Sequence, residues 1–385
     1  MSKYINRYLI ALVFAISTLL TGCNNTYFKP DKSSSLRKIN TRYTEIHKSV
    51  FEYAYMNINF TRNGNTAAIF DASEISFYDL NQHRIIKKIQ ARDWWRLKYG
   101  ESSKDGKYYL LIIDGFIRIL DTQNWQTIAQ FKIKNSISNH PNFSDNGTRL
   151  YTGNSLWNIA TGEHIKESVF SIDQTSSDFS DNNHYFILSD GVYGATLVDM
   201  ESKKRLETLP VIKYSRQVTF RDNHSFYIDY GAKTSYFTKT LGLFNIEPQA
   251  MLAEITPYQA ISCWTRLKED KRLIMGLVDG SLLVLDEKLH VLEHWNIGSK
   301  ALKCIGGKNA RVWLATGVVE PSDPSEKYTS YNLYEVNINQ KTISSPVQLE
   351  GTIKHLAVSP DGKYIALVND LPNKTMARIY LNNDL

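Results

Sequence analysis

The sequence feature that most constrains the fold is a tight turn that follows an apolar stretch and recurs about every 40 residues. It is clearest in residues 358–380, VSPDGKYIALVNDLPNKTMARIY, where Asp361-Gly362 separates two apolar stretches. Glycine accepts positive φ and aspartate bonds its own backbone, so this dipeptide favours a turn. Similar turns, the last four less regular, are predicted at Asn63-Gly64, Asp105-Gly106, Asn146-Gly147, Asn182-Asn183, Asn223-His224, Glu269-Asp270 and Lys308-Asn309.

Each interval between turns has room for four short strands. The first unit predicts strands over residues 56–60, 66–70, 76–80 and 84–89, and the second unit repeats this pattern. A repeat of about 40 residues with four strands is typical of a β-propeller blade. Evenly spaced strands also suit a two-sheet sandwich, but the self-similarity along most of the 385 residues favours an all-β propeller of four-stranded blades.

The last unit lacks its fourth strand. It predicts strands over residues 353–358, 364–368 and 377–381, and the chain then stops. Because an unpaired sheet edge is a liability, we expect residues 41–50 to supply the missing strand beside residues 378–381 and so to close the ring. Eight turns then predict eight blades. Seven is the alternative, because the turn at Glu269-Asp270 is poor.

The third strand of several units ends in an aliphatic or aromatic residue followed by Asp or Asn. The pairs are Tyr78-Asp79, Leu120-Asp121, Trp157-Asn158, Val198-Asp199, Phe244-Asn245 and Leu285-Asp286. Over about residues 40–385 this resembles the WD-repeat family and the quinoprotein-like propellers, and it implies their fold. No unit has the full Trp-Asp dipeptide or an upstream Gly-His in step, and the adjacent cysteine pair of pyrroloquinoline-quinone enzymes is absent, so no cofactor is expected.

The N-terminus resembles a bacterial lipoprotein signal. Lys3 and Arg7 precede an apolar core, Leu9–Leu20, which is shorter than the ~20 residues of a membrane span. Leu20-Thr21-Gly22-Cys23 follows and is similar to a lipobox. The resemblance implies removal of residues 1–22 and acylation of Cys23. The alternative is an ordinary secretory signal with an incidental cysteine.

Residues 23–40 are predicted to be a lipidated cysteine and a flexible polar tether, which as a coil reaches roughly 20–25 Å. The alternative is that part of this segment packs on the first blade. The propeller domain itself is predicted over residues 41–385. Asn24 stands where an enteric inner-membrane lipoprotein has Asp. The expected location is therefore the bacterial cell envelope, at the outer membrane and facing the periplasm, with the lipid as the membrane contact.

The net charge bears on the class of partner. The formal charge of +6 falls to +4 without Lys3 and Arg7, and the basic residues are scattered, so no nucleic-acid partner is expected.

Cys263 and Cys304 occupy similar places in the innermost strands of consecutive units. In an oxidising compartment they form either a disulfide or two buried free thiols, and the sequence leaves both open.

Chemical motifs are absent. The nine histidines do not cluster, and His290 and His294 lie in a strand-turn-strand context, where positions four apart on a strand are about 13 Å apart. The sequence has no Gly-x-Ser-x-Gly elbow, P-loop or dinucleotide fingerprint. No catalytic, cofactor-binding or metal-binding residue is predicted.

Two segments are candidates for partner binding. Trp94, Trp95 and Arg96 lie at a blade junction, and paired aromatics with arginine are typical of interface hot spots. Core packing is the alternative for them. The seventh unit is lengthened by an insertion with two prolines, expected to form an exposed loop. Its candidate contact residues are Pro321, Asp323, Pro324 and Tyr328, and the alternative is a neutral insertion without a binding role.

These observations favour a non-enzymatic, lipid-anchored propeller that serves as a protein–protein interaction scaffold, as a monomer or in a hetero-complex. Its exposed sheet edges are one route to partners, by β-augmentation. One alternative is an exported enzyme of the lactonase-like or quinoprotein-like kind, which needs a polar constellation at the channel mouth. Another is a carbohydrate or polymer binder that uses exposed Tyr and Trp.

Overall fold

The computed structural model describes most of the repeat region. The described residues are 36–39, 43–51, 57–71, 74–91, 97–103, 105–132, 142–144, 147–151, 155–159, 164–167, 176–189, 194–202, 204–206, 212, 214–231, 238–299, 302–306, 310–316, 331–349, 352–371 and 374–383. Every regular element among them is a β-strand.

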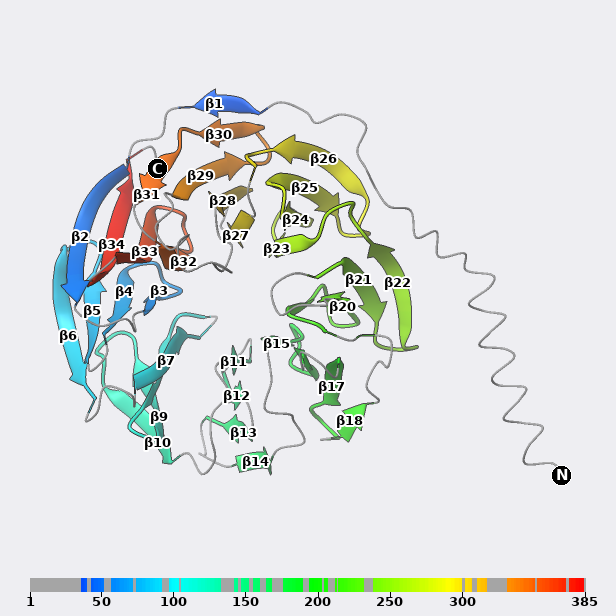
Figure 1. The fold of residues 1–385 in the computed structure, drawn as a ribbon. Coiled ribbons are helices and arrows are strands. Elements are labelled where there is room, and N and C mark those ends of the chain that lie inside the picture. The colour runs from blue at the N-terminus through cyan, green and yellow to red at the C-terminus, as the bar shows by residue number, and fades with distance from the viewer. Residues whose placement is uncertain are drawn as a thin grey trace, which may run out of the picture.

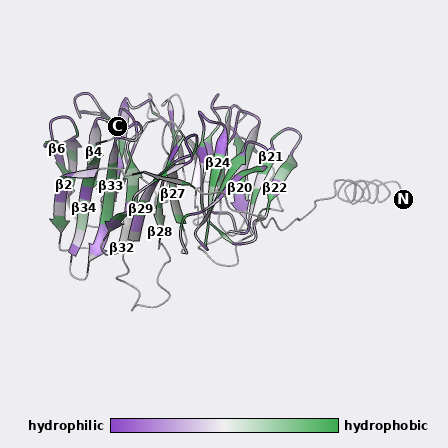
Figure 2. Cartoon of the chain, turned by 90° about the horizontal axis from the view of Figure 1, so that it is seen from above, coloured by the Kyte–Doolittle hydropathy of each residue, from purple (hydrophilic) through white to green (hydrophobic). Residues whose placement is uncertain are grey.

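The strands form eight small antiparallel sheets arranged in a ring (Figure 1). Seen from the side, the strands run across the thickness of a disc (Figure 2). The protein is an eight-bladed β-propeller, so the predicted fold class and blade number are confirmed, and the seven-bladed alternative is wrong.

Blades 1 to 4 follow the chain from residue 57. Their strands are β3 (Asn57–Phe60), β4 (Thr66–Phe70), β5 (Glu74–Asp79) and β6 (Arg84–Gln90); β7 (Leu97–Ser102), β8 (Tyr108–Ile113), β9 (Phe116–Asp121) and β10 (Thr127–Lys132); β11 (Asn142–Phe143), β12 (Arg149–Tyr151), β13 (Ser155–Asn158) and β14 (His164–Glu167); and β15 (Ser176–Phe179), β16 (Tyr185–Ser189), β17 (Ala195–Asp199) and β18 (Lys204–Leu206).

Blades 5 to 8 continue in the same way, and the last two also take up the N-terminal strands. Their strands are β19 (Val218–Phe220), β20 (Ser225–Tyr230), β21 (Thr240–Asn245) and β22 (Ala250–Ile255); β23 (Ile261–Leu267), β24 (Arg272–Leu277), β25 (Ser281–Asp286) and β26 (Val291–Asn296); β27 (Leu302–Gly306), β28 (Arg311–Thr316), β29 (Tyr331–Asn337), β30 (Thr342–Ser344), β31 (Val347–Leu349) and β1 (Arg37–Ile39); and β32 (Thr352–Val358), β33 (Tyr364–Leu371), β34 (Lys374–Asn382) and β2 (Tyr43–Phe51).

The ring is closed by the N-terminal strand. β2 pairs antiparallel with β34, from Tyr43 opposite Asn382 to Phe51 opposite Thr375, and it is the outermost strand of blade 8. Figure 1 shows β2 beside β34. The predicted closure is confirmed, and it places an N-terminal and a C-terminal strand in one sheet.

A second N-terminal strand was not predicted. β1 pairs in parallel with β30 on the outer edge of blade 7. The predicted tether, residues 23–40, therefore overlaps the propeller at residues 37–39. The segment packs on blade 7, whereas the alternative placed it on the first blade. Three paired residues carry too little hydrophobic periodicity to be recognised as a strand.

Eight apolar clusters fill the eight interfaces between neighbouring blades. Alternate residues of one second strand contribute to different interfaces: Tyr109 and Leu111 pack towards blade 1, whereas Leu110 and Ile112 pack towards blade 3. Because both faces of these strands are covered, they are apolar throughout rather than alternating. Trp295 and Trp313 are completely buried, as expected for tryptophans that pack between blades.

The turn between the first and second strands of a blade depends on a buried hydroxyl. In five blades a Ser or Thr two residues before the turn Asp or Asn is at most 1% exposed: Thr61, Ser103, Ser144, Ser180 and Ser359. In the last blade the Ser359 hydroxyl donates to Asp361 Oδ1 at 2.6 Å and accepts the N–H of Tyr364 at 2.8 Å. Gly362, at φ 76°, donates its N–H to the Ser359 carbonyl at 2.8 Å.

We expect Ser359→Ala to lower the free energy of unfolding by about 1–3 kcal/mol, because the N–H of Tyr364 and the carboxylate of Asp361 both lose a buried partner. Urea denaturation measures this change. Ser299→Ala, at an exposed serine, is the control and should change stability by less than about 0.5 kcal/mol. Equal effects of the two substitutions would contradict the role of the buried hydroxyl.

The outer edges of the blades carry protective features. The outermost strands β2, β6, β10, β14, β22 and β26 each contain a register shift typical of a β-bulge. In blade 4 the outer strand β18 has three residues, and in blade 7 β30 is covered by β1. Bulges and short strands discourage pairing with other chains.

Candidate functional site

Polar side chains join the innermost strands of adjacent blades around the central channel. These strands belong to different sheets, so they are not joined by a backbone ladder. Hydrogen bonds from a side chain of one inner strand to the inner strand of the next blade connect them. The bonds are Asn59 Nδ2 to Gly100 O at 2.8 Å, Asn142 Nδ2 to Ser177 O at 2.8 Å, Thr219 Oγ1 to Asp178 Oδ2 at 2.8 Å, and Ser262 Oγ to Leu302 O at 2.8 Å. They hold the channel wall in a fixed geometry.

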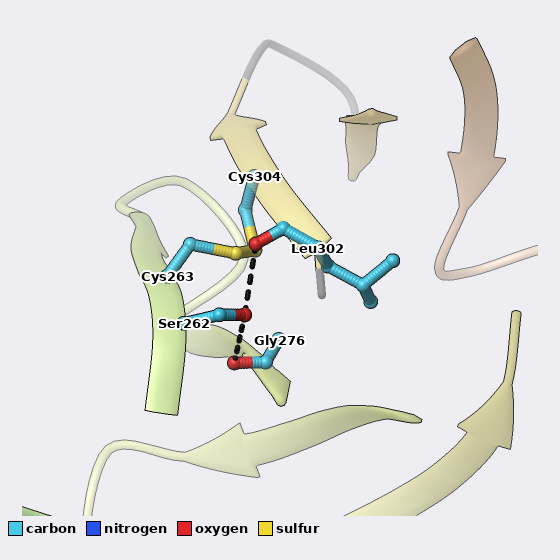
Figure 3. Close-up of a disulfide and its surroundings, with 5 residues drawn as sticks. All are labelled: Ser262, Cys263, Gly276, Leu302 and Cys304. Carbon is cyan, nitrogen blue, oxygen red and sulfur yellow. Dashed lines mark hydrogen bonds between the residues drawn. A yellow bond between two sulfur atoms is a disulfide. The ribbon is translucent and has the colours of Figure 1, made fainter. Parts of the chain in front are cut away.

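Blades 6 and 7 are also joined covalently. Cys263 of β23 and Cys304 of β27 form a disulfide, with Cα atoms 5.6 Å apart, inside the ~7 Å limit for such a bond (Figure 3). Gly276 makes room for it, because a Cβ there would lie 2.6 Å from the Cys263 sulfur and 2.8 Å from the Leu302 Cβ. Of the two states that the sequence left open, the structure has the disulfide.

The ring closure contains a buried carboxylate. Glu335 of blade 7, with a side chain 6% exposed, accepts hydrogen bonds from Tyr43 at 3.0 Å and Asn382 at 2.8 Å, and it forms an ion pair with Arg311 at 2.7 Å. Burial, with the nearby Glu335 carboxylate, raises the pKa of Tyr43 well above its ordinary value. This closure cluster (Tyr43, Arg311, Glu335 and Asn382) links the two outer strands of blade 8, β2 and β34, to blade 7.

A cavity of about 610 Å³ opens at one face of the channel. Turn residues of three blades line it, namely Arg62, Lys268–Asp270 and Ser359–Pro360, together with inner-strand residues of blades 1, 2, 6 and 8. We call the face that carries the turns between first and second strands the turn face. The volume falls within the range of roughly 300–1,000 Å³ that is usual for ligand pockets.

Two basic side chains at this cavity already have partners on blades 4 and 5. Lys268 of blade 6 forms an ion pair of 2.5 Å with Asp181 of blade 4, and Arg266 donates to the Phe220 carbonyl of blade 5 at 2.9 Å. Among the residues that the structure describes, the exposed side chains of Arg62 and Glu269 make neither an ion pair nor a hydrogen bond. Among the described residues that line the cavity, Arg62 is therefore a cation and Glu269 an anion with no side-chain partner.

Asp229 is a buried carboxyl group outside the lining of the cavity, and its contacts are structural. Asp229, 3% exposed, accepts the N–H groups of Arg216 and Gln217 at 2.9 and 2.7 Å and the Thr238 hydroxyl at 3.1 Å. Burial raises the pKa of Asp229, and these hydrogen bonds act in the opposite direction. The carboxyl is enclosed by the segments it joins, so it has no free face for a substrate.

Within the described ranges, no group of three or more His, Cys, Asp or Glu residues is placed to hold a metal ion. His290 lies in the turn before β26 and contacts Asp286 at 2.9 Å, while His294 lies within β26. This agrees with the strand-turn-strand interpretation of the pair.

All seven partner-binding candidates from the sequence, and the lipidation candidate Cys23, fall outside the part of the chain that the structure describes. Cys23, Trp94, Trp95 and Arg96 lie outside the described residues, as does the insertion with Pro321, Asp323, Pro324 and Tyr328. The free charges at Arg62 and Glu269 were missed, because the sequence does not tell which turn residues of blades 1 and 6 border one cavity.

Comparisons with models of known protein families and with curated proteins gave no match. The part of the chain that the structure describes contains no helix long and apolar enough to cross a bilayer. The structure thus shows a β-propeller, and no matched family ties it to the WD-repeat or quinoprotein-like proteins.

Proposed function

We propose that this protein is a non-enzymatic scaffold of the bacterial cell envelope, which binds another protein at its turn face and is held to the membrane by a lipid on Cys23. The observation that carries the proposal is the cavity at the channel mouth. It is bordered by strands and turns of blades 1, 2, 6 and 8, and it offers unpaired charges of both signs at Arg62 and Glu269. A polypeptide segment with its own charges and amide groups is complementary to such a surface.

The residues that line the cavity also help to choose between a protein partner, a carbohydrate ligand and an enzymatic function. Among the described residues that line the cavity, Phe60 is the one Phe, Tyr or Trp, whereas sugar-binding surfaces rely on such aromatic platforms. Over the described residues, Tyr214 is the one aromatic side chain among the exposed large hydrophobic residues. These facts favour a protein partner over a carbohydrate. The exported-enzyme alternative needs a nucleophile with a base, or a pair of carboxylates free for proton transfer.

The membrane anchor rests on residues 1–23 of the sequence. Several acyl chains, each contributing ~0.8 kcal/mol per buried CH₂, give near-permanent attachment where one chain does not. An anchored scaffold also gains effective concentration near its partner. The outer membrane is the proposed location, on the basis of Asn24.

Palmitate labelling tests the anchor. Wild-type protein expressed in a Gram-negative host should incorporate label and fractionate with the outer membrane, whereas Cys23→Ala should incorporate none, because the thiol is the acceptor. Cys263→Ala is the matched control and should label like the wild type. Equal labelling of the wild type and Cys23→Ala would show that acylation does not occur at that residue.

Photo-crosslinking tests the binding face. A photoreactive residue at Arg62 or Glu269 should give one reproducible adduct with an envelope protein in intact cells. The same residue at Ile128, on the rim of blade 2 and 51% exposed, should not give that adduct. The double charge reversal Arg62→Glu/Glu269→Lys should reduce recovery of the partner in a pull-down. Adducts from Ile128 equal to those from the cavity positions would reject the turn face as the binding site.

A further inference from the structure

The N-terminal segment does not leave the disc at an arbitrary point. β1 lies along the outer edge of blade 7, with Arg37 opposite Thr342, Lys38 opposite Ile343 and Ile39 opposite Ser344 (Figure 1). Leu36, directly before β1, packs on the apolar cluster between blades 6 and 7. The chain that runs back to Cys23 therefore begins at the rim between these two blades.

The low exposure of β30 shows that β1 packs closely against it. The three residues of β30 are 1%, 8% and 2% exposed. The outermost strands of blades 1 and 2, which have no covering strand, are largely exposed. Because β1 removes both a sheet edge and Ile343 from water, its docking is favourable, and the exit point of the N-terminal segment is fixed in space.

We infer that β1 turns the rim of blades 6, 7 and 8 towards the bilayer and leaves blades 2, 3 and 4 facing away. The inference rests on the proposed function in one respect, the anchor at Cys23. Whatever its conformation, the chain of 13 residues from Cys23 to Leu36 spans at most about 45 Å, so the edge of blade 7 stays within that distance of the anchor. If β1 were undocked, the chain would be held at Tyr43 of blade 8, and 20 residues span at most about 70 Å.

This orientation leaves the turn face open to the side. The anchor reaches the disc through its rim, so the bilayer lies against the edges of blades 6 to 8 and not across the mouth of the cavity. A membrane-bound or free partner then approaches the cavity along the plane of the membrane. The rim of blade 7 acts as the membrane-facing surface, and its ligand is the lipid headgroup layer.

Three rim positions of equal exposure make the test direct. Val50 of blade 8, Leu292 of blade 6 and Ile128 of blade 2 are 52%, 50% and 51% exposed. The chain starting at Cys23 is coupled through that thiol to a maleimide lipid in phosphatidylcholine vesicles, while Cys263 and Cys304 stay protected in their disulfide. A fluorescent non-canonical residue is placed at one rim position at a time, and a headgroup nitroxide lipid is the quencher. Chemical coupling makes the result independent of whether cells acylate Cys23.

The probes at Val50 and Leu292 should be quenched about twofold or more relative to the probe at Ile128, because blades 6 and 8 flank the anchored edge of blade 7 and blade 2 does not. The variant Leu36→Gly/Arg37→Ser/Lys38→Gly/Ile39→Ser keeps the length of the segment but removes β1. In it, quenching at Leu292 should fall towards the Ile128 value, while Val50 keeps most of its own. Equal quenching at Leu292 and Ile128 in the unaltered chain, or no change at Leu292 on removal of β1, would overturn the inference.

Discussion

Replacing Glu335 by alanine is expected to lower the free energy of unfolding by about 3 kcal/mol or more, because it leaves partners of a buried carboxylate without an acceptor. Arg311 loses an ion pair of 2.7 Å, and Tyr43 and Asn382 lose hydrogen bonds of 3.0 and 2.8 Å. All of these partners belong to blades 7 and 8, where the ring closes. The loss therefore acts on the closure itself and should appear as a lower midpoint of urea unfolding.

Two variants separate the charge from the geometry. Glu335→Gln keeps the shape and one carbonyl acceptor, so we expect an intermediate loss of stability. Glu293→Ala removes a carboxylate that pairs with exposed Lys341 and should change stability by no more than about 1 kcal/mol. If Glu335→Ala were no more destabilising than Glu293→Ala, the closure cluster would not hold the ring.

Removal of the disulfide by Cys263→Ser/Cys304→Ser is expected to destabilise the protein by about 2–4 kcal/mol, since the bond closes a loop over a sequence separation of 41 residues in the unfolded chain. The two serines preserve most of the side-chain volume between blades 6 and 7. Chemical denaturation of the oxidised wild type against the double variant measures the difference.

A reducing agent supplies the control for this prediction. Reductant should lower the stability of the wild type towards that of the double variant and leave the double variant unchanged. A double variant as stable as the oxidised wild type would show that the hydrogen bonds of Ser262 and the packing around Gly276 already fix the interface without the covalent bond.

The architecture was predictable because it is repetitive. The recurrence of turns such as Asp105-Gly106 and Asp361-Gly362 gives the number of blades, and the missing fourth strand of the last unit indicates where the N-terminal strand must pair. Both inferences use spacing along the chain and the requirement that a sheet edge be covered. The structure has β2 beside β34, as that requirement demands.

The contacts that depend on a side chain meeting a distant one were not predictable. Tyr43 and Glu335 are 292 residues apart, and Lys268 and Asp181 are 87 apart on different blades. No local pattern indicates such pairs. By contrast, the buried turn hydroxyls follow a pattern in the sequence. A Ser or Thr stands two residues before the turn Asp or Asn, as Thr61, Ser103 and Ser359 do. β1 had none, because its three residues resemble the polar segment before them.

The most direct test of the closed ring is native-state hydrogen exchange of residues 43–51, measured in the unaltered protein by mass spectrometry. If β2 completes blade 8, the amides of this segment that face β34 should exchange several orders of magnitude more slowly than an unstructured peptide, through the same opening as residues 364–371 of β33. Exchange of residues 43–51 at the rate of an unstructured peptide, with residues 364–371 still protected, would contradict closure of the propeller by its N-terminal strand.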